Sequence, residues 1–458
     1  MSQRLTKLIG ISYSEFTSIA SEHKEIHLRP ARLIPMHKPG DEMALTSIFL
    51  SSLKLIKEFR REISSAVSMS SSGSIHLFTE VTFEKYPDKR VDGLMLVVRG
   101  NKISDAALFE LKNKNNDLDD SQIQDYIGIA KYFAIPRIIT VSNQFVSKPT
   151  QSPLNVKLPK DVSLYHLSWS YILTIARLLL FDNNMNINEP DQVEIMEEVV
   201  NYLEHKQSGV CGFTSMKPGW KDVVQKTNAG APLRFDANDV DEAVCSWLQE
   251  EKDMALILSR RLGQFVESGE KKFKTDLQGR IDNEKKALIE QKYLLSTLSV
   301  DGAVSSISVR ANLDRRNIVM SVSLNPPQDR KTRGQISWLR YQLKRCQTKN
   351  PDLFESLAKE IRIGIGIKYS SKCERVSIEA LEDVWLKLKD SVIKSFTILQ
   401  VKDLGRKFSS RTSFITTIES MLLDYYEGIV QHLKRWEKPA PKISNKTLLT
   451  DEDNLEEL

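Results

Sequence analysis

Hydrophobic and polar positions in the first 181 residues predict a helix, then a sheet, then further helices. In residues 45–67, apolar side chains recur mostly at spacings of three and four, which is typical of a helix with one buried face. In residues 75–84, apolar and polar side chains alternate, which predicts a strand. The same patterns predict strands at 91–98, 105–112, 137–145 and 162–169, and helices at 122–134 and 171–181.

The same patterns divide the chain into five parts. Residues 1–44 are polar and punctuated by prolines, so we expect an irregular N-terminal arm before the mixed helix-and-strand domain at 45–181. Residues 191–300 predict a mainly helical region, and residues 301–437 predict a smaller α+β domain. Residues 438–458 contain proline and then acidic residues, which predicts a disordered tail. The expected fold class is therefore mixed, α+β or α/β, with a helix-flanked sheet in the first domain.

The net charge of the chain indicates which kind of molecule it can bind. The chain has 458 residues, with 65 Lys and Arg against 60 Asp and Glu, and a formal net charge of +5. Because residues 450–458 alone carry five negative charges, the rest of the chain carries +10. A moderately basic body suits a polyanionic partner such as a nucleic acid.

Other features exclude several classes of protein. No apolar run has the length that a transmembrane helix needs, and the N-terminal residues lack the pattern of a secretory signal. The four cysteines are scattered, without the spacing of a zinc site, and their number fits a reducing compartment. We therefore expect a cytoplasmic protein that does not associate with a membrane.

Three charged residues on two predicted strands are the strongest candidates for chemistry. Asp92 lies nine residues before Asn101, and Glu110 lies nine residues after it. A turn centred near Asn101 therefore makes the two carboxylates cross-strand neighbours, although a bulge would shift this pairing by one residue. Glu110 and Lys112 are two residues apart on one strand, so their side chains share a face.

Two carboxylates and an ammonium group on one face are costly unless they have partners or a metal. Asp92 and Glu110 supply the oxygen ligands with which proteins hold Mg²⁺, and Mn²⁺ suits the same ligands. Lys112 can orient or deprotonate a water and stabilise negative charge in a transition state. The set fits metal-dependent hydrolysis of a phosphodiester. The alternative is an exposed strand face that carries a surface ion pair.

The motifs Val91-Asp92 and Glu110-Leu111-Lys112, in a helix–strand–strand–strand–helix–strand order, resemble those of the PD-(D/E)XK nuclease superfamily. The resemblance covers about residues 45–181 and implies a restriction-endonuclease-like mixed sheet. It also implies that Asp92 and Glu110 hold Mg²⁺ or Mn²⁺ and that Lys112 serves the attacking water. One departure is Val91, which stands where the family pattern has proline and removes no ligand.

Further residues enter through the same resemblance. Gln122 and Tyr126 are four residues apart on a predicted helix, like the QxxxY signature of several branches, and would position Lys112 or contact phosphate. The family often adds a metal-binding glutamate from its first helix, for which Glu62 is preferred to Glu58. Glu80 is a weaker candidate, because strand alternation turns it outward.

The function that the resemblance implies is a Mg²⁺-dependent nuclease, with DNA expected as substrate before RNA. Cutting both strands of a duplex with one site per chain favours a homodimer. Restriction, phage defence and DNA repair are the expected contexts, and a protein activator is a further expectation. Two alternatives remain: a nucleic-acid- or protein-binding module on a nuclease-like fold, and a structural subunit of a larger complex without its own activity.

A basic segment at residues 329–349 is the main candidate for contacts with nucleic acid. Its net charge is +6, and Trp338 and Tyr341 lie among the cations. The alternative is a solvated helix face. The candidate residues are Arg330, Lys331, Arg333, Arg340, Lys344 and Arg345.

Overall fold

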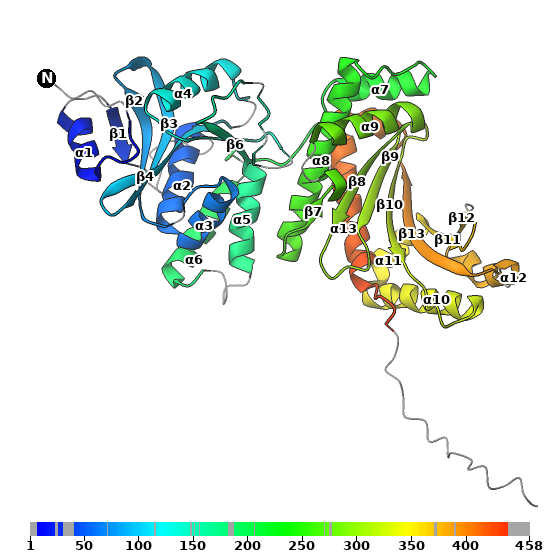
Figure 1. Cartoon of the computed structure of the whole chain (residues 1–458). Helices are drawn as coiled ribbons and strands as arrows, with labels where there is room; N and C mark the ends of the chain where they lie inside the picture. Colours follow the sequence, from blue (N-terminus) through cyan, green and yellow to red (C-terminus); the bar gives the residue numbers. More distant parts are fainter. Residues whose placement is uncertain are drawn as a thin grey trace, which may run out of the picture.

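The protein has two helix-and-sheet parts that follow one another along the chain (Figure 1). A computed structural model describes residues 7–22, 26–30, 41–70, 72–113, 116–146, 149–150, 152–154, 156–181, 187–205, 207–269, 271–273, 277–370, 373–388 and 391–437. The predicted acidic tail at 438–458 lies outside the described residues.

The first part contains a six-stranded mixed sheet. Its strands are β1 (Ile26–Pro30), β2 (Ser74–Phe83), β3 (Tyr86–Arg99), β4 (Lys102–Leu111), β5 (Arg137–Ser142) and β6 (Ser163–Ser168), and they lie in sequence order. Neighbouring strands from β1 to β4 are antiparallel, whereas β4, β5 and β6 are parallel. The carboxyl ends of β4, β5 and β6 therefore meet at one edge of the sheet.

Helices cover both faces of this sheet (Figure 1). They are α1 (Tyr13–Glu22), α2 (Glu42–Leu55), α3 (Lys57–Ala66), α4 (Asp120–Tyr132), α5 (Trp169–Phe181) and α6 (Pro190–Glu204). One hydrophobic core joins α2, α3, α5 and α6 to the sheet, and the other joins α1 and α4 to its opposite face. On β4, Phe109 and Leu111 belong to the first core and Leu108 to the second, as the alternation of a strand requires. Glu110 therefore faces α4.

The elements of the first part follow the predicted pattern closely, with two exceptions. The helix expected at 45–67 is interrupted at Ile56, which has extended backbone angles and separates α2 from α3. The expectation of an irregular arm at 1–44 is wrong for the described residues, because α1 and β1 lie there and β1 pairs with β2. β1 is a five-residue edge strand that ends at a proline, too short for a clear alternating pattern.

The second part contains a seven-stranded antiparallel sheet in the order β12-β11-β13-β10-β9-β8-β7. Its strands are β7 (Glu267–Ser268), β8 (Tyr293–Ser299), β9 (Ile307–Asn312), β10 (Asn317–Leu324), β11 (Ile361–Ile367), β12 (Cys373–Val376) and β13 (Ile393–Asp403). β9 and β10 form an antiparallel hairpin. Because β7 and β8 belong to this sheet, it crosses the boundary expected at residue 300.

One hydrophobic core unites the helices of the second part with its sheet. The α-helices are α7 (Gly219–Asn228), α8 (Asn238–Leu262), α9 (Leu277–Gln291), α10 (Thr332–Lys349), α11 (Pro351–Ala358), α12 (Val384–Leu388) and α13 (Arg411–Gly428). Short 3-10 helices lie at η1 (Lys271–Phe273), η2 (Glu379–Glu382), η3 (Gly405–Ser409) and η4 (Val430–His432). No helix of the described chain is long and apolar enough to cross a membrane.

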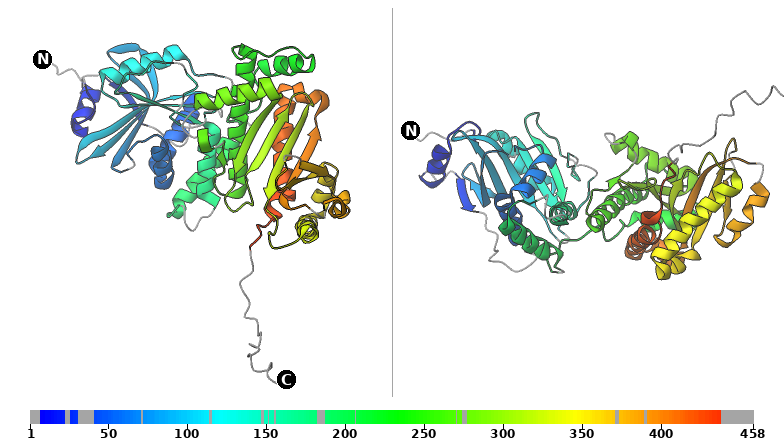
Figure 2. Two further views of the ribbon diagram at one scale, coloured as in Figure 1. Left: turned by 45° about the vertical axis from the view of Figure 1, so that its right-hand side comes forward. Right: turned by 90° about the horizontal axis from the view of Figure 1, so that it is seen from below.

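The two parts form separate lobes that meet at α5 and α8 (Figures 1 and 2). Ser170 Oγ on α5 donates a hydrogen bond of 3.0 Å to Asp253 Oδ1 on α8. Arg260 of α8 reaches back to Ser170 Oγ and Thr174 Oγ1, each at 3.0 Å. Because α5 starts directly after β6, the second part lies close to the carboxyl edge of the first sheet.

Candidate active site

Asp92 and Glu110 lie on the neighbouring strands β3 and β4. Gly93 pairs with Phe109, which places Asp92 and Glu110 one step further along the same ladder. Asp92 Oδ2 accepts a hydrogen bond of 2.8 Å from the backbone N–H of Leu111. The cross-strand proximity expected from the sequence is therefore present in the fold.

This pairing depends on an irregularity near the turn between the two strands. The register of β3 against β4 shifts by one residue between Val97 and Val98. The tight turn alone would bring Asp92 opposite Phe109, whose side chain lies in the core. The shift brings Asp92 opposite Glu110 instead, so the bulge sets the geometry of the carboxylate pair.

Glu110 is fully buried and has a partner for each carboxylate oxygen. Its Oε1 lies 2.7 Å from Lys112 Nζ, and the Tyr126 hydroxyl hydrogen-bonds to its Oε2. The same hydroxyl lies 3.2 Å from the carbonyl oxygen of Arg90 and accepts a hydrogen bond of 3.1 Å from the backbone N–H of Asp92. Tyr126 therefore contacts both strands that carry the carboxylates.

Helix α4 positions Tyr126 against the sheet. The helix is capped by Asp119, whose side chain accepts a hydrogen bond of 3.1 Å from the N–H of Ser121. Gln122 lies one turn before Tyr126 and is half-buried. Within the described chain, no hydrogen bond joins Gln122 to Asp92 or Glu110. The structure thus brings Tyr126 into the site and leaves Gln122 beside it.

Burial and like charge act together on Asp92. Burial raises the pKa of this carboxyl group well above its usual range, and repulsion from Glu110 and Glu80 raises it further. The N–H of Leu111 and the charge of Lys112 oppose this rise. Two carboxylates that repel each other are a favourable place for a cation, because a cation stabilises both charged forms.

Lys112 and Tyr126 keep their protons at neutral pH. Burial lowers the pKa of Lys112, but its hydrogen bond to Glu110 and the nearby carboxylates outweigh burial and raise the pKa overall. Burial raises the pKa of Tyr126 well above its usual range, and the charges of Asp92 and Glu110 add to that effect. The Lys112 side chain keeps 18% of its surface exposed, so a water or substrate can reach it.

Glu80 lies closer to this site than strand alternation predicted. Thr79 pairs with Gly93 and Val81 pairs with Val91, so Glu80 lies opposite Asp92 on β2. Its backbone has φ 54°, which breaks the alternation, and its side chain is buried rather than outward. Glu80 is held by Arg90, whose Nε lies 2.8 Å from its Oε2.

The expectation that Glu62 binds the metal is corrected by its position. Glu62 lies on α3, where Phe59 and Ile63 enter the core on the sheet face opposite Glu110. Its side chain is 45% exposed and contacts only the neighbouring Arg61, at 3.4 Å, among the ion pairs of the described residues. Glu58 lies on the same helix, is buried, and accepts a long hydrogen bond of 3.4 Å from Asn188 Nδ2.

Glu42 is the acidic residue near Lys112 that the sequence interpretation missed. It lies in the first turn of α2, and its Oε1 accepts hydrogen bonds from the N–H of Asn113 at 3.2 Å and from Asn116 Nδ2 at 2.7 Å. Its charge contributes to the raised pKa of Lys112. The sequence did contain a signal for the start of this helix, because Asp41 directly precedes Glu42 and aspartate is a common N-cap residue. In the structure, the Asp41 side chain accepts hydrogen bonds from backbone N–H groups in the first turn of α2.

The donor set suits a hard divalent cation with few protein ligands. No group of three or more His, Cys, Asp or Glu in the described part of the chain is arranged to hold a metal ion. Asp92 and Glu110 provide two carboxylates, and Mg²⁺ is commonly held by one or two carboxylates plus waters and substrate phosphates. The residues therefore fit Mg²⁺ or Mn²⁺ and do not form a complete protein cage.

The basic segment forms α10 and distributes its cations over two sides of the helix. Arg330 and Arg345 line a groove of about 580 Å³ together with Trp436. Arg340 and Lys344 line a different groove of about 520 Å³. Arg333, Arg340 and Lys344 lie along one stripe of the helix that faces residues 379–388: Arg333 lies 5.0 Å from the ring of Trp385, and Arg340 pairs with Glu382 at 2.9 Å.

Comparisons of the chain with protein-family models, with curated proteins and with solved structures found no match.

Proposed function

We propose that the protein is a Mg²⁺- or Mn²⁺-dependent nuclease whose site contains Asp92, Glu110 and Lys112. One observation carries this proposal: the three side chains gather at adjacent strands, with the Lys112 ammonium 2.7 Å from Glu110. DNA is the preferred substrate over RNA, in keeping with the family resemblance of the motif. The same resemblance supports a role in restriction, phage defence or DNA repair, and cutting both strands of a duplex with one site per chain favours a homodimer.

Each residue has a role that follows from its surroundings. Asp92 and Glu110 would hold the metal, which when bound acts as a Lewis acid toward the phosphodiester. Lys112 keeps its proton, so it orients a water and stabilises negative charge rather than removing a proton. Tyr126 holds Glu110 and the backbone of Asp92 in place.

The test is cleavage of supercoiled and linear duplex DNA, single-stranded DNA and RNA, with Mg²⁺ or Mn²⁺ and with EDTA. We expect metal-dependent cutting that falls by about 100-fold or more in Glu110→Gln and in Lys112→Ala. Glu62→Gln is the matched control, because it removes an exposed carboxylate from the same domain. Cutting that survives both site substitutions would overturn the assignment of the site.

A second candidate is a binding module on a nuclease-like fold. It is favoured by the burial of Glu110, whose two oxygens already have Lys112 and Tyr126 as partners.

Thermal unfolding with and without Mg²⁺ distinguishes the nuclease from the binding module. A nuclease site predicts that millimolar Mg²⁺ raises the melting temperature of the wild type and not that of Glu110→Gln. Nucleic-acid binding without cutting, and without a metal-dependent shift, would favour the module.

A further inference from the structure

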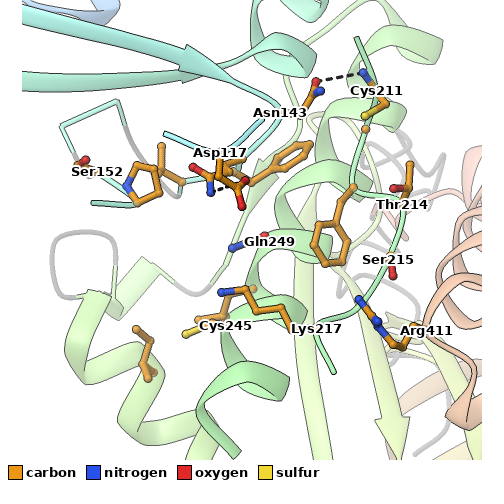
Figure 3. Close-up of a pocket in the computed structure, with 18 residues that line it drawn as sticks. Asp117, Asn143, Ser152, Cys211, Thr214, Ser215, Lys217, Cys245, Gln249 and Arg411 are labelled. Carbon is orange, nitrogen blue, oxygen red and sulfur yellow. Dashed lines mark hydrogen bonds between the residues drawn. The ribbon is translucent and has the colours of Figure 1, made fainter. Parts of the chain in front are cut away.

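A cavity of about 640 Å³ lies where the two parts of the chain meet (Figure 3). The first part contributes Asp117, from the connection between β4 and α4, and Gln144, from the segment after β5. The second part contributes Lys217, Gln249 and Arg411. This volume is within the usual range for small-ligand sites, about 300–1,000 Å³.

The cavity lies at the carboxyl edge of the first sheet, where the chain leaves β4 next to Glu110 and Lys112. Asp117 lies five residues after Lys112, and β4 and β5 are parallel neighbours. Gln144 Nε2 donates a hydrogen bond of 3.0 Å to Asp117 Oδ1, so the two segments form one wall. The crevice outside the carboxyl ends of parallel strands is the usual ligand position in such sheets.

Two cations face this wall from the second part. Figure 3 shows the Lys217 side chain directed toward Cys245 and Gln249, and no described residue forms an ion pair with it. Arg411 donates from Nε to the carbonyl oxygen of Met216, which leaves its other guanidinium N–H groups available. Free cations at a cavity of this size are suited to a phosphate group.

Two side-chain amides able to contact a base line the cavity, Gln144 from the first part and Gln249 from the second. With its amide nitrogen bonded to Asp117, Gln144 keeps a buried Oε1 that accepts no hydrogen bond from any described residue. Gln249 adds a second amide to the lining. The side-chain amide of Asn143, in contrast, already has hydrogen-bond partners in the protein. It donates to the carbonyl oxygen of Gly209 at 2.9 Å and accepts from the N–H of Cys211 at 3.2 Å.

We infer that this cavity binds one nucleotide, with its phosphate at Lys217 and Arg411 and its base edge at Gln144 and Gln249. The favoured source is a nucleotide of the strand held at Asp92 and Glu110, and in that form the inference rests on the proposed function. A free nucleotide has the same chemistry and is the other source. In either form the cavity gives the protein a way to distinguish bases close to the cleavage site.

The test measures binding in EDTA, where metal-dependent cutting cannot occur. Isothermal titration with the ribo- and deoxyribonucleoside 5′-monophosphates measures the free ligand, and anisotropy of labelled single-stranded 20-mers of DNA and RNA measures the strand. We expect Lys217→Ala to weaken binding about tenfold. Lys221→Ala is the matched control, because Lys221 is exposed on α7 and does not line the cavity. Gln249→Ala is a second test variant, and melting curves check that each variant folds.

The outcomes separate the inference from the proposed function. Weaker binding of the 20-mers to both Lys217→Ala and Gln249→Ala supports a nucleotide of the strand, and the same loss with monophosphates alone supports a free nucleotide. Equal affinities of Lys217→Ala and Lys221→Ala for every ligand would overturn the inference, even if the wild type cuts DNA. A wild type that binds nucleotides through Lys217 but cuts no nucleic acid would instead contradict the nuclease proposal. The inference that the cavity binds a nucleotide would then still hold.

Discussion

The Tyr126 hydroxyl hydrogen-bonds to the Glu110 carboxylate and so ties helix α4 to the central strand β4. The same hydroxyl accepts a hydrogen bond of 3.1 Å from the backbone N–H of Asp92 on β3. One side chain thereby sets the position of both carboxylates. The spacing of Gln122 and Tyr126, four residues apart, predicted proximity for both, but only Tyr126 has these contacts.

Replacing Tyr126 with Phe should therefore damage the site more than the fold. The change removes a hydroxyl and leaves buried polar groups of Glu110 and Asp92 without that partner, which costs about 1–3 kcal/mol of unfolding free energy. Urea unfolding measures this loss. Cleavage should fall by about tenfold or more, because the carboxylates are no longer held in place. Unchanged cleavage together with reduced stability would assign Tyr126 a structural role only.

A glycine beside Asp92 lets helix α2 pack close to the strand pair. A Cβ built at Gly93 would lie 2.8 Å from Leu50 Cδ1 and 3.0 Å from Phe109 Cβ. Gly93→Ala should therefore destabilise the protein by about 1–3 kcal/mol through overpacking. Gly128→Ala is the control, because its Cβ would meet nothing closer than 3.7 Å and alanine favours the helix by about 1 kcal/mol. Equal stability of the two variants in urea unfolding would contradict this account.

The alternation of strands and the spacing around Asn101 were sufficient to predict where Asp92, Glu110 and Lys112 lie. These features are local, and the alternation of β4 is strong because Phe109 and Leu111 are core residues. The bulge between β3 and β4 could not be read from the pattern: the prediction assumed a turn centred on Asn101, whereas in the structure the turn lies one register step away and the bulge restores the pairing of Asp92 with Glu110.

Other residues were misplaced because their positions depend on backbone geometry or tertiary packing. The Glu80 side chain is buried because its backbone has a positive φ, and the alternation of polar and apolar residues does not reveal that angle. Glu62 was placed near the metal through the family resemblance, but α3 packs on the sheet face opposite Glu110, a tertiary arrangement that the sequence pattern does not reveal. Glu42 was missed because α2 begins three residues before its periodic pattern does.

The raised pKa of Asp92 predicts how stability depends on pH. Burial first, and then Glu110, raises this pKa above its usual value of 3.8 in the folded protein. Between the two values the folded state binds more protons than the unfolded state, so stability falls as pH rises through that window. Asp92→Asn removes the titrating carboxyl group and with it this loss of stability at higher pH. The substituted side chain keeps an oxygen that can still accept the hydrogen bond from the N–H of Leu111. In EDTA above the window, Asp92→Asn should therefore be more stable than the wild type.

Urea unfolding between pH 4 and pH 8 measures this difference, with Glu62→Gln as the control for removing a carboxylate. The advantage of Asp92→Asn should shrink toward the acid end of the range. Adding Mg²⁺ at pH 8 should reverse the order, because the wild type binds the ion and the variant has lost a ligand. An Asp92→Asn protein that is less stable than the wild type in EDTA at pH 8 would show that Asp92 stabilises the fold.

The division of the α10 cations predicts which of them contact nucleic acid. Arg345 lines the groove of about 580 Å³ with Lys434 and the exposed Tyr341, whereas Arg340 is paired with Glu382 at 2.9 Å. Arg345→Ala should weaken binding of duplex DNA and lower the slope of log affinity against log salt by about 0.9, the value for one phosphate contact. Arg340→Ala should change the slope less, because its charge already has a partner. Anisotropy titrations at several salt concentrations measure both slopes, and equal slopes for the two variants would exclude this groove as the binding surface.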